Sequence, residues 1–166
     1  MVRTLVLGLG NILLSDDGAG VRVVERLLKE YHFPPEVQVM DGGTLGLDLL
    51  HYVADVDRLL VVDALDLKAS PGTLARLADG EVPAFLAPKI SPHQMGLVDL
   101  LAASRLSGHF PAKLVLWGAQ PESLEVGLEL SATVAAQVDS LVERVLAELS
   151  QWGISPARIA NEEEPT

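Results

Sequence analysis

Residues 6–20 read VLGLGNILLSDDGAG, and this stretch decides the fold. An apolar run ends in the glycine turn GLG at residues 8–10, and two adjacent carboxylates, Asp16 and Asp17, follow it. A strand that breaks into a glycine turn and delivers acidic side chains at the start of a helix is typical of an active-site edge in an α/β protein. Phosphate-binding loops also use glycines, but they avoid paired acids. The stretch therefore predicts an acidic site at the end of a first strand.

The rest of the chain alternates short apolar strands with helices. Apolar residues spaced three and four apart predict an amphipathic helix over residues 20–31, with Asp16 as its cap. Unbroken apolar runs, such as RLLVVDA at residues 58–64, are typical of parallel strands covered on both faces. The expected strands lie at 4–8, 37–40, 58–64 and 113–119, with an antiparallel edge strand within 72–78. Further helices are expected near 47–53, 92–104 and 131–149, the last of them capped by Ser131. This order predicts an α/β three-layer sandwich: a mostly parallel twisted sheet of about five strands with helices on both faces.

Length and charge limit the classes of function. We expect one domain over residues 1–155 of the 166, followed by a disordered acidic tail over 156–166. The formal net charge of −11 disfavours nucleic acids and anionic membranes as partners, because polyanions repel one another. No apolar run approaches the roughly 20 residues that span a bilayer. The sequence contains no cysteine, which excludes thiolate metal sites and cysteine nucleophiles and speaks against a disulfide-stapled secreted fold. We therefore expect a cytoplasmic protein.

Acidic residues follow three of the expected strands. Asp17 follows the first strand, Asp41 the second and Asp63 the third. Ligands of such sheets bind outside the carboxyl ends of the strands, so these acids are expected at the binding edge. His93, near the start of a later helix, can join them if that helix packs beside the third strand. Two carboxylates and one imidazole suit a borderline divalent ion such as zinc, nickel, cobalt or manganese, and three protein ligands leave coordination positions open.

Structural roles are also open to these residues. We expect at least one of Asp16 and Asp17 to be only a helix cap, and Asp63 could cap a turn. A histidine that follows Ser-Pro is more often a first-turn residue than a ligand. A dinucleotide site is disfavoured because the third glycine of G-x-G-x-x-G would fall at Leu13. The sequence contains neither a G-x-S-x-G elbow nor an H-E-x-x-H motif, so it offers no nucleophile or zinc motif of those kinds.

Five segments, in this order along the chain, resemble the hydrogenase maturation endopeptidases. They are GLGNILLSDDGAG at residues 8–20, DGGT at 41–44, VDA at 62–64, SPHQ at 91–94 and QPES at 120–123. Any one of these segments is a weak signal, whereas five in order at comparable spacing are specific. The resemblance implies a cytoplasmic endopeptidase that removes a C-terminal extension from the large subunit of a nickel-iron hydrogenase after nickel has been inserted.

The resemblance also implies a ligand set. In that family the metal is bound by an acidic residue of the first loop, an aspartate after the third strand and the histidine of the S-P-H-Q segment. The corresponding residues here are Asp17, Asp63 and His93. The family accepts Glu or Asp at the first of these positions, and the two adjacent aspartates leave Asp16 as an alternative to Asp17.

We expect these three side chains to bind the nickel of the precursor rather than a permanent catalytic metal, although zinc or cadmium could occupy the site in the isolated protein. Asp41 is the candidate base for the attacking water. The candidate contacts with the extension are Asp16, Gly42, Gly43, Thr44 and Gln94. The expected partner is the large-subunit precursor, and we expect a monomer. Two rivals stay open: a metallopeptidase with its own zinc, and a non-catalytic nickel chaperone, against which the lack of a histidine-rich tract speaks.

Overall fold

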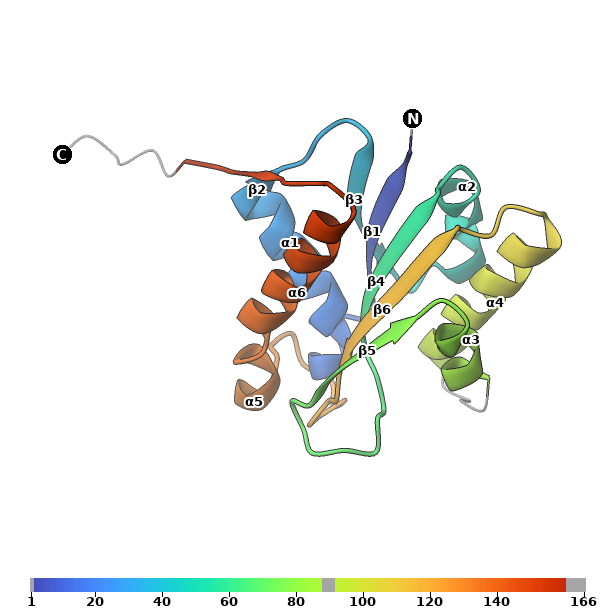
Figure 1. Ribbon diagram of the computed structural model, residues 1–166. Helices are drawn as coiled ribbons and strands as arrows, with labels where there is room; N and C mark the ends of the chain where they lie inside the picture. Colours follow the sequence, from blue (N-terminus) through green and yellow to red (C-terminus); the bar gives the residue numbers. More distant parts are fainter. Residues whose placement is uncertain (1, 88–91, 161–166) are drawn as a thin grey trace.

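Five strands form one sheet in the described part of the chain, which comprises residues 2–87 and 92–160 of the computed structural model. The order across the sheet is β3-β1-β4-β6-β5 (Figure 1). The strands are β1 (Thr4–Leu9), β3 (Val37–Gly43), β4 (Arg58–Ala64), β5 (Leu74–Ala78) and β6 (Lys113–Ala119). All neighbours are parallel except β5, which runs antiparallel to β6 at the edge. The predicted mostly parallel α/β sheet is confirmed, including its antiparallel edge strand.

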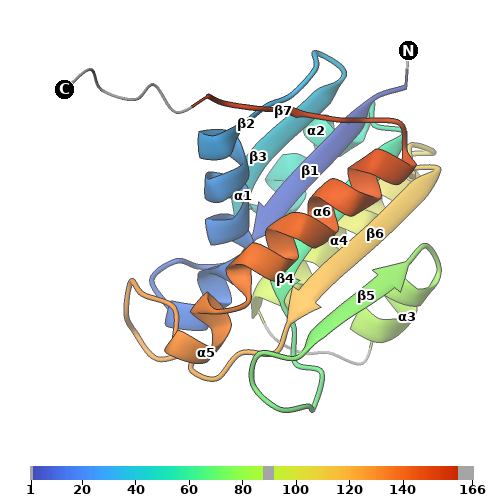
Figure 2. The ribbon, with the colours of Figure 1, turned by 60° about the vertical axis from the view of Figure 1, so that its left-hand side comes forward.

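Helices cover both faces of the sheet. Figures 1 and 2 show α1, α5 and α6 on one face and α2, α3 and α4 on the other. Their bounds are α1 (Ala19–Glu30), α2 (Leu50–Val53), α3 (Glu81–Leu86), α4 (Pro92–Leu106), α5 (Ala132–Ala135) and α6 (Val138–Gln151), with two 3-10 turns, η1 (Ser15–Gly18) and η2 (Gly46–Leu49). None of these described helices is long and apolar enough to cross a membrane.

The strands are apolar throughout because each of their faces meets a separate core. In β1, Leu5 and Leu7 belong to the core under α2, α3 and α4, whereas Val6 belongs to the core under α1 and α6. In β4, Leu59 and Leu60 divide between the two cores in the same way. Fully burying one such side chain is worth about 1.5–3 kcal/mol, so the central strands hold the three layers together.

Three segments differ from the expectations. The helix expected near residues 47–53 is the turn η2 followed by the single turn α2. The last expected helix is divided into α5 and α6; Ser131 caps α5 as predicted, since its Oγ accepts a hydrogen bond from the N–H of Val134 at 3.3 Å. The tail expected to be disordered from residue 156 includes a two-residue strand, β7 (Ala157–Arg158), which pairs with β2 (Tyr31–His32) through backbone groups. Residues 161–166 lie outside the described part.

The strand order predicts a ligand-binding crevice at one edge of the sheet. From β1 the chain passes through α1 to β3 on one side, and then returns through α2 to β4 on the other side of β1. These two connections lie on opposite faces of the sheet (Figure 2). The point between β1 and β4 is therefore a topological switch point, where α/β proteins bind their ligands.

The glycines of the opening stretch allow α1 to start close to this crevice. Gly10 adopts a φ of +126°, a conformation that other residues rarely take. A Cβ atom at Gly20 would overlap the carbonyl oxygen of Val62 in β4 and would lie 2.7 Å from the carbonyl oxygen of Leu9. The glycines thus serve a tight turn and backbone packing, rather than phosphate binding.

The substitution Gly20→Ala should therefore destabilise the fold strongly. Backbone atoms surround the position, so the chain must shift to make room, at a cost of about 3 kcal/mol. Gly80→Ala is the matched control, because φ at Gly80 is −61° and no atom lies within 4 Å of an added Cβ. Urea unfolding of the three proteins measures the difference, and equal midpoints for Gly20→Ala and the wild type would contradict the packing argument.

Candidate active site

Two buried aspartates from distant parts of the chain lie at the switch point. Asp17 belongs to η1, directly after β1, and Asp63 is the penultimate residue of β4. Both side chains are buried, and η1 contacts β4. A buried carboxylate is costly unless hydrogen bonds or a cation compensate it. Two such groups at the ligand-binding edge supply the oxygen donors that a divalent cation needs.

Backbone groups hold both aspartates in place. The carboxylate of Asp17 accepts a hydrogen bond from the N–H of Asn11 at 2.8 Å, within the same loop. The loop itself is joined to the end of β3, because the N–H of Gly10 donates to the carbonyl of Gly43 at 2.9 Å. Oδ1 of Asp63 accepts from the N–H of Ala64 at 2.8 Å. The positions of the two carboxylates are therefore fixed by the ends of β1, β3 and β4.

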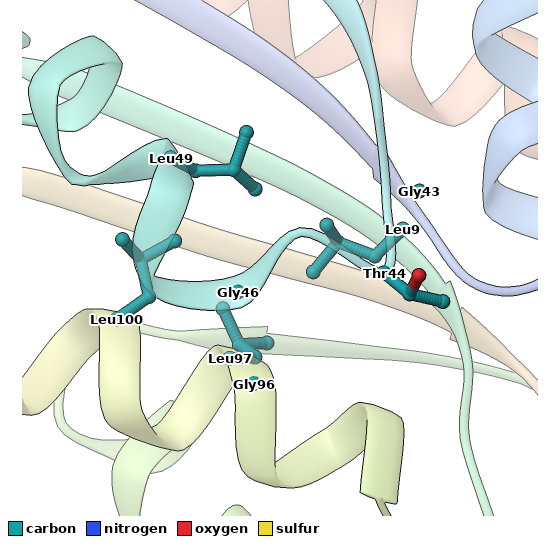
Figure 3. A pocket seen from close by; sticks show the side chains of 8 residues that line it. All are labelled: Leu9, Gly43, Thr44, Gly46, Leu49, Gly96, Leu97 and Leu100. Carbon is teal, nitrogen blue, oxygen red and sulfur yellow. The ribbon is translucent and has the colours of Figure 1, made fainter.

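The helix that carries His93 packs beside this edge. α4 begins at Pro92 and contacts η2, where Gly46 faces Gly96 so closely that a Cβ on Gly46 would lie 3.4 Å from the Cα of Gly96. Figure 3 shows this crossing, with Leu97 and Leu100 of α4 directed toward the segment that follows Gly43. The two glycines let the early part of α4 approach the loop that follows β3.

The third expected ligand lies outside the described side chains. The structure does not describe the side chains of residues 92–95, and so the predicted roles of His93 and Gln94 stay predictions. Among the side chains that are described, no three His, Asp or Glu residues form a group that could hold a metal ion. Asp17 and Asp63 fit a cation by their chemistry and their burial, and a complete three-ligand site requires a residue such as His93.

The segment from Asp41 to Thr44 forms the other side of the edge. β3 extends to Gly43, beyond the expected end at residue 40. Asp41 and Thr44 are exposed, and Oδ1 of Asp41 accepts from the N–H of Gly43 at 2.8 Å. Gly42 is buried against Leu7 and Leu9, so its lack of a side chain serves packing. An exposed carboxylate held by a local turn is available to a substrate or a water molecule.

Asp16 has a different role from its neighbour. Neither aspartate caps α1, whose N-cap is Gly18 without a side-chain hydrogen bond, so the capping expectation is wrong. The carboxylate of Asp16 is fully buried and accepts four hydrogen bonds of 2.7–3.0 Å, from the N–H groups of Glu122, Ser123 and Ser131 and from the hydroxyl of Ser131. These donors lie at least 106 residues away along the chain. Local spacing therefore gave no signal of this role.

A second side chain at this edge also ties two loops together. Oε1 of Gln120, directly after β6, accepts a hydrogen bond from the N–H of Leu67 at 2.6 Å, in the loop that follows β4. Gln120 belongs to the QPES segment, for which the resemblance implies no role. Gln120 and Asp16 together fix the loops after β1, β4 and β6 around the crevice.

The environment of Asp16 favours its ionised form. Burial raises the pKa of the carboxyl group, but the N–H groups of Ser123, Ser131 and Glu122 and the hydroxyl of Ser131 outweigh burial and lower the pKa below the ordinary value of 3.8. A carboxyl group with a lowered pKa in the fold stabilises the protein above its unfolded pKa, and this contribution is lost as the pH falls through the folded pKa.

The substitution Asp16→Asn should cost about 2 kcal/mol of unfolding free energy at neutral pH, because the amide NH₂ would face N–H donors. The difference from the wild type should shrink as the pH falls below the ordinary aspartate value of 3.8. Urea unfolding between neutral pH and about pH 3 measures both effects. Asp139→Asn, at a carboxylate with 77% exposure, is the control and should change little. An Asp16→Asn protein as stable as this control would contradict the anchoring role.

Comparisons with known proteins show to which family the chain belongs. The family model described as hydrogenase maturation protease matches residues 21–148. The hydrogenase 2 maturation protease of Escherichia coli K12 is 49% identical over 154 residues, which are 92% of this chain and 94% of that protein. The hydrogenase expression/formation protein HupD of Rhodobacter capsulatus is 44% identical over 154 residues, 92% of this chain and 73% of that protein.

Solved structures agree as well. The hydrogenase maturating endopeptidase HybD from E. coli superimposes with a TM-score of 0.91 at 48% identity, covering 95% of this chain and 98% of that one. The hydrogenase maturation protease HybD from Thermococcus kodakarensis gives a TM-score of 0.72 at 30% identity, covering 87% and 97%. The resemblance carried by the five segments is confirmed over the sequence and the fold, and the chain therefore belongs to the hydrogenase maturation protease family of endopeptidases.

Proposed function

We propose that this endopeptidase removes a C-terminal extension from the large-subunit precursor of a nickel-iron hydrogenase, and that it recognises the nickel already inserted there. The nickel ion is then part of the substrate and not a cofactor of the protease. The observation that carries the proposal is the pair of buried carboxylates, Asp17 and Asp63, at the crevice between β1 and β4. Buried acids at the binding edge of a protein of net charge −11 favour a cationic ligand.

In this proposal the ligands to nickel are Asp17, Asp63 and His93. Asp17 is preferred to Asp16 because the oxygens of Asp16 already accept four hydrogen bonds from the protein. A neutral imidazole ring at His93 would supply the third ligand, a nitrogen atom. Three protein ligands leave room for the ligands that the precursor itself supplies.

Water is the proposed nucleophile, since the sequence offers neither a cysteine nor the serine of a G-x-S-x-G elbow. Bound nickel can orient or polarise the scissile peptide. Asp41 is the proposed base for the water, since its carboxylate is exposed at the end of β3 beside the crevice. The neighbouring Gly42, Gly43 and Thr44 supply backbone and hydroxyl groups that could hold the extension.

A paired assay tests whether the protease recognises the nickel in its substrate. Wild-type protein should shorten the nickel-loaded precursor and leave the nickel-free precursor intact, as seen by mass spectrometry of the large subunit. Asp17→Asn, Asp63→Asn and His93→Ala should each slow processing by at least about a hundredfold, because each removes a ligand. Asp48→Asn, at an exposed acid of η2 on the same edge, is the matched control and should be fully active.

Three results would overturn parts of this proposal. Equal processing of the nickel-loaded and nickel-free precursors would show that nickel is not recognised, and would favour a metallopeptidase with its own metal. Stoichiometric zinc in the purified protein, with cleavage of unrelated peptides, would support that rival directly. Full activity of all three ligand variants would remove the site assignment.

The role of Asp41 can be tested separately. Asp41→Asn should lower kcat by about 10²–10⁴-fold, because the amide cannot accept the proton of the attacking water. The amide oxygen can still accept the hydrogen bond from the N–H of Gly43, so the turn should persist. Retention of nickel-dependent binding to the precursor is the control for folding, and an unchanged kcat would contradict the role as base.

A further inference from the structure

Exposed apolar side chains gather around the candidate site. Of the ten large apolar side chains exposed in the described part of the chain, five lie on the loops after β1, β3 and β6, at the edge that holds Asp17 and Asp63. The five are Leu13, Leu45, Leu124, Val126 and Leu128. Single exposed apolar residues are ordinary, whereas a group of them around a site marks an interaction surface.

Four of these residues lie on two loops that are joined to each other, and we call them the apolar rim: Leu13, Leu124, Val126 and Leu128. Backbone hydrogen bonds join their loops, because the N–H of Gly127 donates to the carbonyl of Leu13 at 2.9 Å and the N–H of Ser15 donates to the carbonyl of Gly127 at 2.9 Å. Figure 2 shows the two loops together, the first after β1 and the second ahead of α5. Val126 is the most exposed member, at 89%.

The fold fixes the rim beside the proposed nickel ligand. Asp16 holds the loop of residues 122–131 through its four hydrogen bonds, and the next residue in the chain is Asp17. The hydroxyl of Ser15 adds a further bond to the carbonyl of Glu125 at 2.6 Å. A loop that merely joins β6 to α5 has no need of apolar side chains directed into water. Their exposure on loops that are held in place is typical of an interaction surface.

We propose that the apolar rim is the docking surface for the body of the large-subunit precursor, a proposal that rests on the proposed function. A protein whose C-terminal extension enters the crevice must lie against the loops that border it. The rim loop also carries three exposed carboxylates, at Glu122, Glu125 and Glu129. We therefore expect the facing surface of the precursor to be apolar at its centre and basic where it meets these glutamates.

The same charges disfavour a second copy of this chain as the occupant. Two rims brought face to face would oppose their carboxylates, in a chain whose net charge is −11. Like charges across an interface are unfavourable, whereas basic margins on a partner would be attracted. Charge thus distinguishes the precursor from self-association.

The test compares two substitutions in the rim with an equally exposed one elsewhere. The double variant Leu124→Ser, Val126→Ser truncates the rim, and Leu106→Ser is the control, because Leu106 is 90% exposed at the far end of α4. KM and kcat for the nickel-loaded precursor, and Kd by titration with the same precursor, are measured for each protein. The double variant should raise KM and Kd about tenfold or more. Its kcat should stay within about twofold of the wild type, because the rim contacts are the same in the bound substrate and in the transition state.

Charge variants at one position sharpen the test. Val126→Lys should weaken binding more than Val126→Glu, because the lysine would repel the basic margins expected on the precursor. Thermal unfolding of each variant checks that the fold is retained. Little change is expected, because all of the substituted side chains are exposed.

The outcomes separate this proposal from the proposed function. If the wild type processes the precursor and the double variant has the same KM and Kd as Leu106→Ser, the docking surface alone is overturned. If the wild-type protein neither processes nor binds the precursor, both proposals are overturned. Self-association that disappears in the double variant, with KM unchanged, would assign the rim to a second copy and overturn the precursor as its occupant.

Discussion

The arrangement of the active-site edge depends on one buried carboxylate, that of Asp16. Its four hydrogen bonds join the first loop of the chain to the segment before α5, at least 106 residues later. Each bond to a charged acceptor is worth about 1.5–3 kcal/mol in its own right. The larger effect is positional, because the loop that bears Asp17 and the loop that bears Glu122 and Val126 cannot move independently.

The sheet provides the second constraint. Because β1 and β4 are adjacent while their connections leave on opposite faces, the residues that follow β1 and those that end β4 meet at a crevice. Gly20 allows α1 to start against the backbone of Val62, and Gly46 and Gly96 allow α4 to approach from the other face. Small residues at these contacts thus determine how closely helices from both faces reach the edge that carries Asp17 and Asp63.

The sequence predicts those parts of this architecture that depend on local patterns. Apolar runs predict the strands, and the rule that ligands bind outside the carboxyl ends of parallel strands predicts Asp17 and Asp63 at one edge. The cap at Ser131 was also predicted, since its partner is three residues away. The role of Asp16 was not predictable, because hydrogen bonds with distant backbone groups leave no spacing pattern. The pairing of β7 with β2 was missed for the same reason: backbone groups make it, and the residues of β7 are exposed. The ligand role of His93 stays a prediction.

If the rim binds the body of the precursor, and Asp17 and Asp63 bind its nickel, the two interactions have different consequences for specificity. Contacts at the rim are the same for nickel-loaded and nickel-free precursors, so they add affinity for both and cannot distinguish them. Only the bonds from Asp17, Asp63 and a third ligand to the metal differ between the two forms. Selectivity for the loaded precursor is therefore bounded by the free energy of metal ligation, however large the rim. A much stronger rim would hold immature precursors without nickel and block the site, which favours a small apolar surface of a few side chains such as Leu124 and Val126.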